Sequence, residues 1–264
     1  MKKKVVKKNN TKTIKTIVIS IFTIVFLGGL LFLTFKELLT EKDITINNET
    51  LVSDSDKFET EFESLNNVLI DDRTYLSVNI NNPNPMKYID VKTIVEKIDN
   101  KETFLVYFGY AKCQWCRTTV ETMINQAKEY NIENIYYLNI EDIRDEYILN
   151  ENHELYLNKE GTEEYKLLLE KFDSILDMYQ PLEYVDLKDK IVSVPINEKR
   201  IYAPTLVFVK EGVPELKTNG IPQGMTDAYQ YPSDDMREES KVYYNLLYTE
   251  YNNSGSDTCL KDMC

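Results

Sequence analysis

Two cysteines, Cys113 and Cys116, follow a run of aromatic and β-branched residues from Phe104 to Tyr110. Such a run is typical of a buried strand, and the residues after Cys113 have the spacing of an amphipathic helix. Cysteines three positions apart at a helix start bring their sulfur atoms close enough to bond. The free N–H groups and dipole of the first turn favour an anion there. The sequence therefore predicts redox chemistry, with Cys113 as the nucleophilic thiolate and Cys116 as the resolving thiol.

A C-x-x-C pair also occurs as half of a zinc site or as an inert structural disulfide, and both remain alternatives. The strand before the pair and the helix after it favour the redox role. Lys112 and Arg117 flank the pair with positive charge, which stabilises a thiolate. Gln114 and Trp115, between the cysteines, are predicted to contact the substrate. Trp115 could equally pack beside the pair.

The composition argues against several other functions. The chain of 264 residues has one histidine, His153, so a histidine-rich metal site or a Ser-His-Asp triad has little support. The formal net charge is -13, with 44 acidic against 31 basic residues. Nucleic acid is also negatively charged and repels a protein with this net charge, so we exclude it as a partner. We expect neither a cofactor nor a metal.

The N-terminus has the pattern of a membrane anchor. A lysine-rich segment, 1–15, precedes an uncharged apolar run, 16–35, which has the roughly 20 residues that a helix needs to cross a bilayer. A cleaved signal peptide is the alternative, but its apolar core is usually shorter and ends in a small-x-small site, which is missing here. The positive-inside rule places the lysines in the cytoplasm. We therefore expect a single-pass protein of the cell membrane with an extracytoplasmic body, where disulfides persist.

The rest of the chain divides by composition. An acidic, Asn-rich stretch is interpreted as a stalk. After it, strands alternate with helices, which predicts an α/β sandwich. An acidic stretch rich in Leu and Tyr, with a helix expected at 162–179, is interpreted as a helical insertion. The predicted segments are a stalk over 36–85, a domain over 86–252 with its insertion at about 142–200 and its closing helix at 234–251, and a flexible tail over 253–264.

Three segments resemble the thioredoxin superfamily, in the order that the family has them. Residues 104–116, which end in Cys-Gln-Trp-Cys, are similar to its active-site strand and turn. Residues 135–141 are similar to its next strand. Residues 202–212 are similar to its cis-proline loop and the hairpin that follows. The resemblance implies a thioredoxin-like three-layer sandwich over residues 86–252, here with a helical insertion and preceded by one N-terminal transmembrane helix.

The resemblance also implies roles for single residues. The bond between Ala203 and Pro204 is expected to be cis, with the backbone of Ala203 facing the substrate beside the cysteines. Where thioredoxins have a buried Asp six residues before the first cysteine, thought to help proton transfer at the second, this chain has Tyr107. The accompanying Lys corresponds to Tyr137, so the sequence shows no obvious base. Gln114 with Trp115 is typical of neither reductants nor oxidants, and the direction of electron flow stays open.

The predicted function is thiol–disulfide exchange on protein thiols and disulfides outside the membrane, with a membrane or extracytoplasmic electron donor as a further partner. Within the superfamily, the nearest resemblance is to the bacteriocin transport accessory proteins of Gram-positive bacteria. The rival interpretation is a non-catalytic accessory or chaperone-like protein that binds a secreted peptide or a transporter. Cys259 and Cys264 in the tail could form a local disulfide, a secondary redox pair for Cys113 and Cys116, or a metal-binding or intermolecular site.

Overall fold

The computed structural model describes residues 52–70 and 72–261, and for 256–261 it describes the backbone alone. The lysine-rich start, the predicted anchor over 16–35 and the first part of the predicted stalk lie outside the described residues. Within the described ranges, no helix is both long enough and apolar enough to span a bilayer. The anchor stays a prediction.

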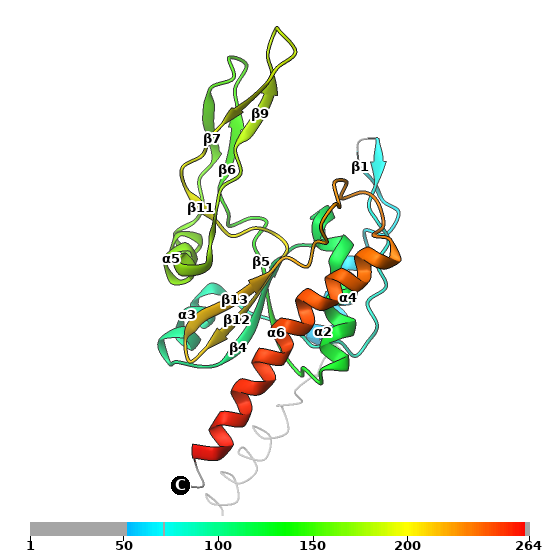
Figure 1. Ribbon diagram of the computed structural model, residues 1–264, viewed down its shortest axis with the longest axis vertical. Coiled ribbons are helices and arrows are strands. Elements are labelled where there is room, and N and C mark those ends of the chain that lie inside the picture. The colour runs from blue at the N-terminus through cyan, green and yellow to red at the C-terminus, as the bar shows by residue number, and fades with distance from the viewer. Residues whose placement is uncertain (1–51, 71, 262–264) are drawn as a thin grey trace, which may run out of the picture. The chain divides into compact units, whose positions relative to one another are not determined.

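A five-stranded mixed sheet lies at the centre of the domain (Figure 1). In spatial order its strands are β13 (Val213–Thr218), β12 (Thr205–Lys210), β4 (Phe104–Gly109), β5 (Ile135–Asn139) and β3 (Met86–Tyr88). Strands β3, β4 and β5 are parallel, while β12 runs antiparallel to both of its neighbours. Strand β4 is buried at every position, which explains its unbroken apolar run. This topology is consistent with the predicted thioredoxin-like fold.

Helices cover both faces of the sheet and complete three layers. On one face, Ile94 and Leu168 pack against Val106 and Phe108 of β4. On the other face, aromatic and aliphatic side chains of three helices enclose Tyr107 and the two cysteines. The first face is covered by α3 (Val91–Asp99) and α5 (Glu163–Phe172), and the second by α2 (Asp54–Glu63), α4 (Gln114–Glu129) and α6 (Asp234–Lys261).

The predicted helical insertion over 142–200 is wrong in its content. Helix α5 belongs to the core layer, and it ends at Phe172 because Asp173 and Ser174 favour turns over helix interiors. The rest of the stretch is β-structure on both sides of α5 and of the short 3-10 turn η1 (Asp173–Ile175). The strands are β6 (Glu146–Leu149) with β7 (Leu155–Lys159), β9 (Leu182–Val185) with β10 (Ile191–Val194), and β8 (Asp177–Met178) with β11 (Lys199–Arg200).

The two longer hairpins form because their apolar residues alternate with polar ones. Strands β6, β9 and β10 each alternate between half-buried and exposed positions, the period of a strand with one covered face. Their turns contain His153 and Asp189 at positive φ, a conformation in which His and Asp are enriched. The His153 ring stacks on Tyr184 at 4.0 Å and joins one hairpin to the other. His153 is itself exposed, and its stacking on Tyr184 is a contact between the two hairpins.

The predicted stalk is also different from the structure, because the chain from residue 52 to 85 packs onto the domain. Ser53 caps α2 by accepting a hydrogen bond from the backbone N–H of Asp56. Phe58 and Phe62, one turn apart, are fully buried, and Phe58 meets the ring of Tyr137 edge-on at 4.8 Å. A small hairpin of β1 (Leu69–Ile70) and β2 (Arg73–Thr74) and a cis bond before Pro83 follow. The domain therefore begins before α2.

Helix α6 extends to Lys261, beyond its expected end at Tyr251. Most of the segment predicted as a flexible tail thus continues the helix. The side chain of Cys259 and all of Cys264 lie outside the described residues. The three interpretations of this cysteine pair stay predictions.

Candidate functional site

Cys113 and Cys116 lie at the start of α4, directly after β4, as the sequence predicts. Cys113 is the N-cap residue, and its Sγ accepts a hydrogen bond from the backbone N–H of Cys116 at 3.2 Å. Both cysteines are free thiols. Cys113 is 6% exposed and Cys116 is fully buried. Cys113 is therefore the thiol that a substrate can reach, with Cys116 behind it.

The surroundings of Cys116 disfavour its ionised form. Burial raises the pKa of Cys116 well above that of a free thiol, and the neighbouring Cys113 raises it further. A thiol in this environment keeps its proton in the reduced protein.

The loop before β12 faces the cysteine pair. The bond between Ala203 and Pro204 is cis, as expected. The thiol of Cys113 donates a hydrogen bond to the carbonyl oxygen of Ala203 at 3.2 Å. Strand β12 begins at the next residue, Thr205, opposite Phe108 of β4. Two segments distant in sequence thus meet at Cys113, because β4 ends and its antiparallel neighbour β12 begins at the same edge of the sheet.

A groove with a volume of about 1030 Å³ opens over Cys113. Gln114 and Trp115, which are predicted to contact the substrate, both line it, and Trp115 also packs against the core beside the pair. Both amide atoms of the Gln114 side chain are buried without a hydrogen-bond partner among the described residues. Much of the remaining wall is aromatic or sulfur-containing: Tyr110, Met178, Tyr202, Met225, Tyr229 and Tyr243.

Arg117, expected as a flanking charge, is only 3% exposed, and its guanidinium clamps several segments together through hydrogen bonds. Its Nε donates to the carbonyl of Leu76 at 2.6 Å, and Nη1 donates to the carbonyls of Phe62 at 2.8 Å and Ala111 at 3.2 Å. Nη2 donates to Oδ1 of Asn66 at 2.6 Å. Burial lowers the pKa of Arg117 from its usual value. The guanidinium joins the active-site helix to the chain around α2.

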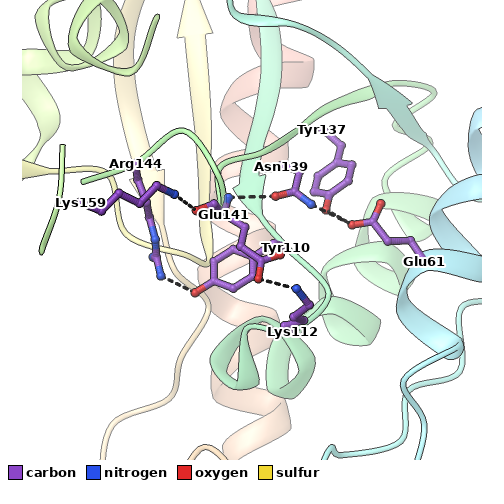
Figure 2. A network of polar contacts seen from close by, with 8 residues as sticks. All are labelled: Glu61, Tyr110, Lys112, Tyr137, Asn139, Glu141, Arg144 and Lys159. Carbon is purple, nitrogen blue, oxygen red and sulfur yellow. Dashed lines mark hydrogen bonds and ion pairs between the residues drawn. The ribbon is translucent and has the colours of Figure 1, made fainter. Parts of the chain in front are cut away.

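Lys112, the second flanking charge, is engaged at the end of a polar network (Figure 2). Its Nζ forms an ion pair with Glu141 at 2.9 Å, which weakens its field at the cysteines. The backbone N–H of Glu141 donates to Oδ1 of Asn139 at 2.9 Å, and Nδ2 of Asn139 donates to Glu61 at 3.2 Å. The hydroxyl of Tyr137 donates to the same Glu61 oxygen at 2.7 Å. Sequence reasoning missed Glu61 because α2 was taken for a stalk.

Arg144 is another residue that sequence reasoning missed. It follows β5 in the stretch interpreted as an insertion, and it lines the groove. Its Nη2 donates to the hydroxyl of Tyr110 at 2.6 Å, and its guanidinium lies 4.8 Å from the ring centre (Figure 2). Burial, followed by the nearby Cys113, raises the pKa of Tyr110 to about 12. The pair places a fixed positive charge on the groove wall.

No family model matches the chain, and no curated protein is significantly similar to it. Among solved structures, the crystal structure of oxidised thioredoxin O2 from Arabidopsis thaliana is similar at 14% identity and a TM-score of 0.27, over 51% of this chain and 81% of that chain. A likeness of this strength carries no argument about activity. The chain is therefore placed by its own topology, as an α/β domain consistent with a thioredoxin-like arrangement.

Proposed function

We propose that the protein is a thiol–disulfide oxidoreductase acting on protein thiols and disulfides. One observation carries the proposal. Cys113 caps the active-site helix at the floor of a groove, with its sulfur 3.2 Å from the carbonyl of Ala203 and the buried Cys116 directly behind it. An accessible thiol backed by a second, buried thiol is the arrangement that dithiol exchange needs.

In the proposed reaction the thiolate of Cys113 attacks one sulfur of a substrate disulfide. The substrate S–S bond breaks, its other sulfur leaves as a thiol, and a mixed disulfide with Cys113 forms. Cys116 then attacks Cys113, the bond to the substrate sulfur breaks, and the substrate leaves as a thiol. Oxidation of the protein dithiol to the disulfide releases two electrons and two protons, which reduce the substrate disulfide to two thiols. The same steps in reverse oxidise a substrate dithiol. The dithiol itself carries the electrons, and its potential decides the direction.

The proposed substrate is an extended segment of an incompletely folded protein. The groove over Cys113 is at the upper end of the range for small-molecule sites and is lined by aromatic and Met side chains. The backbone of Ala203 precedes β12 and can pair with an added strand. The unpartnered amide of Gln114 offers a donor and an acceptor to a substrate backbone.

Turnover of insulin disulfides tests the activity. The reduced domain with dithiothreitol should precipitate insulin well above the rate of dithiothreitol alone. The matched control is the Cys113→Ala, Cys116→Ala variant, which keeps the groove and lacks the thiols. Equal rates for the two proteins would overturn the proposal in favour of the rival, a non-catalytic accessory or chaperone-like protein that binds a secreted peptide or transporter.

We also propose that the protein is anchored in the cell membrane by residues 16–35, with the domain outside. The lysine-rich segment 1–15 and the uncharged run after it support this. The full-length chain should sediment with membranes and resist carbonate extraction, and protease added to intact cells should remove the domain. A shortened protein free in the medium would contradict the anchor.

Kinship with bacteriocin transport accessory proteins is likewise proposed, on the sequence resemblance alone.

A further inference from the structure

A buried hydroxyl behind the cysteines has no hydrogen-bond partner. Tyr107 lies in the middle of β4 with no exposed surface, and its hydroxyl oxygen is among the few buried polar atoms that are unpaired within the described ranges. Buried polar groups are nearly always hydrogen-bonded, so an unpaired one requires an explanation. Phenylalanine would fill the same space without this cost.

Other tyrosines that belong to the same core cluster, or pack against it, are paired. Tyr137 donates to Glu61, Tyr248 donates to the carbonyl of Met123 at 3.0 Å, and Tyr110 accepts from Arg144. Among these four tyrosines, Tyr107 is the one whose hydroxyl has no hydrogen-bond partner. The Tyr107 hydroxyl thus forms no regular hydrogen bond, although the sulfur of Cys116 lies close enough to interact with it.

The position of the Tyr107 ring is fixed by its neighbours on the sheet. It stacks on Tyr137, with ring centres 6.0 Å apart and planes 28° apart. The end of the ring lies over Gly109, where an added Cβ would come within 2.7 Å of the ring and 3.0 Å of the hydroxyl. Gly109 thus leaves room for the hydroxyl at the end of β4 that leads into the cysteine turn.

The hydroxyl of Tyr107 and the sulfur of Cys116 influence each other. Burial raises the pKa of Tyr107 far above its usual value, and the charge of an ionised Cys116 raises it further. Burial dominates the pKa of Cys116, but the Tyr107 hydroxyl acts in the opposite direction, as a donor to the thiolate. Tyr107 therefore keeps its proton and remains a hydrogen-bond donor.

We propose that the Tyr107 hydroxyl donates a hydrogen bond to the Cys116 thiolate as it attacks the mixed disulfide, an inference that rests on the proposed dithiol function. In that step Cys116, which is fully buried, gives up a proton that balances the one taken up by the leaving substrate sulfur. Its sulfur bonds to Cys113, and the bond from Cys113 to the substrate sulfur breaks. The substrate sulfur leaves with the electron pair and takes up a proton. In reverse, the same hydroxyl stabilises Cys116 as the leaving group.

In a Cys259→Ala, Cys264→Ala background, which serves as the unmodified protein here, a chromogenic aromatic disulfide that releases one coloured thiolate at each step separates the two reactions. Tyr107→Phe should leave the first release, the attack by Cys113, at the rate of the unmodified protein. The second release should be slowed roughly ten-fold at low pH, since a hydrogen bond to a charged group is among the strong ones. The pH midpoint of the second release should rise by about one unit, which is the same ten-fold effect.

Tyr248→Phe is the matched control, because it removes a buried hydroxyl from the same core cluster but away from the cysteines. It should change neither phase. Gly109→Ala gives an independent test, because the added methyl group must displace the Tyr107 hydroxyl while leaving it chemically intact. Gly109→Ala should slow the second release and leave the first unchanged. If Tyr107→Phe does not fold, the rate of the second release in Gly109→Ala tests the inference in its place.

A Tyr107→Phe protein whose second release keeps its rate and pH midpoint would overturn the inference. So would a Gly109→Ala protein with an unchanged second release. Failure of the proposed function has a different signature. In that case the unmodified protein would release no second thiolate, and mass spectrometry would find no disulfide between Cys113 and Cys116.

Discussion

Replacing Cys113 by alanine is expected to abolish thiol–disulfide exchange, whereas replacing Cys116 by alanine should preserve the first step and trap the mixed disulfide. The asymmetry follows from position. The sulfur of Cys113 meets the groove and the carbonyl of Ala203, while Cys116 is fully buried and its pKa is raised by that burial. Non-reducing gels and mass spectrometry of the variants with a disulfide-containing substrate measure the trapped species.

The assay is sharpest in a Cys259→Ala, Cys264→Ala background, where Cys113 and Cys116 are the remaining thiols. Brief alkylation of the native reduced protein should modify Cys113 well before Cys116. The same reaction in denaturant is the control, because both thiols are then exposed. Modification of Cys116 first, or a mixed disulfide that persists on Cys116, would reverse the assigned roles.

Replacing Arg117 by methionine is expected to lower the free energy of unfolding by about 3–5 kcal/mol. The change removes four hydrogen bonds from a buried site. Two of the acceptors, Asn66 Oδ1 and the carbonyl of Phe62, keep another donor, and each buried group left unsatisfied costs about 1–3 kcal/mol. Urea unfolding followed by circular dichroism measures the loss. Limited proteolysis should also cut the segment between Phe62 and Leu76 earlier than in the unmodified protein.

Two further variants show what the guanidinium contributes. Arg117→Lys keeps the charge but cannot reproduce the planar set of donors, so it should lose more than half of the same free energy. Arg237→Met is the matched control. Its side chain is 44% exposed and forms one ion pair with Asp234 at 3.7 Å, so its removal should cost less than about 0.5 kcal/mol. An Arg117→Met protein as stable as the control would show that the clamp does not hold the N-terminal segment.

The cysteine turn could be predicted because its signals are local. Strand β4 is buried on both faces and reads as an unbroken apolar run, and α4 begins at its own capping residue, Cys113. The cis bond before Pro204 was expected from the resemblance to a family and is confirmed. Predicting these elements required no knowledge of contacts between residues that are distant in the sequence.

The N-terminal part of the domain could not be predicted because its contacts are distant in sequence. Helix α2 is acidic, and two phenylalanines, Phe58 and Phe62, account for its buried apolar surface. Its place depends on Tyr137 and Arg117, which lie far along the chain. For the same reason, the position of Tyr107 could be noted from the sequence, but its unpaired hydroxyl required the structure.

The hairpins on either side of α5 have a consequence for how such a protein can change over evolutionary time. Strands β6, β7, β9 and β10 form two-stranded sheets of their own and add no strand to the central sheet. The bases of the inserted segments contribute Arg144, Met178 and Gln180 to the groove, whereas the reacting sulfurs are held by β4 and α4. In the proposed exchange, one set of segments lines the substrate groove and another holds the reacting sulfurs. Exchanging a hairpin should therefore alter the groove wall and leave the cysteine pair in place.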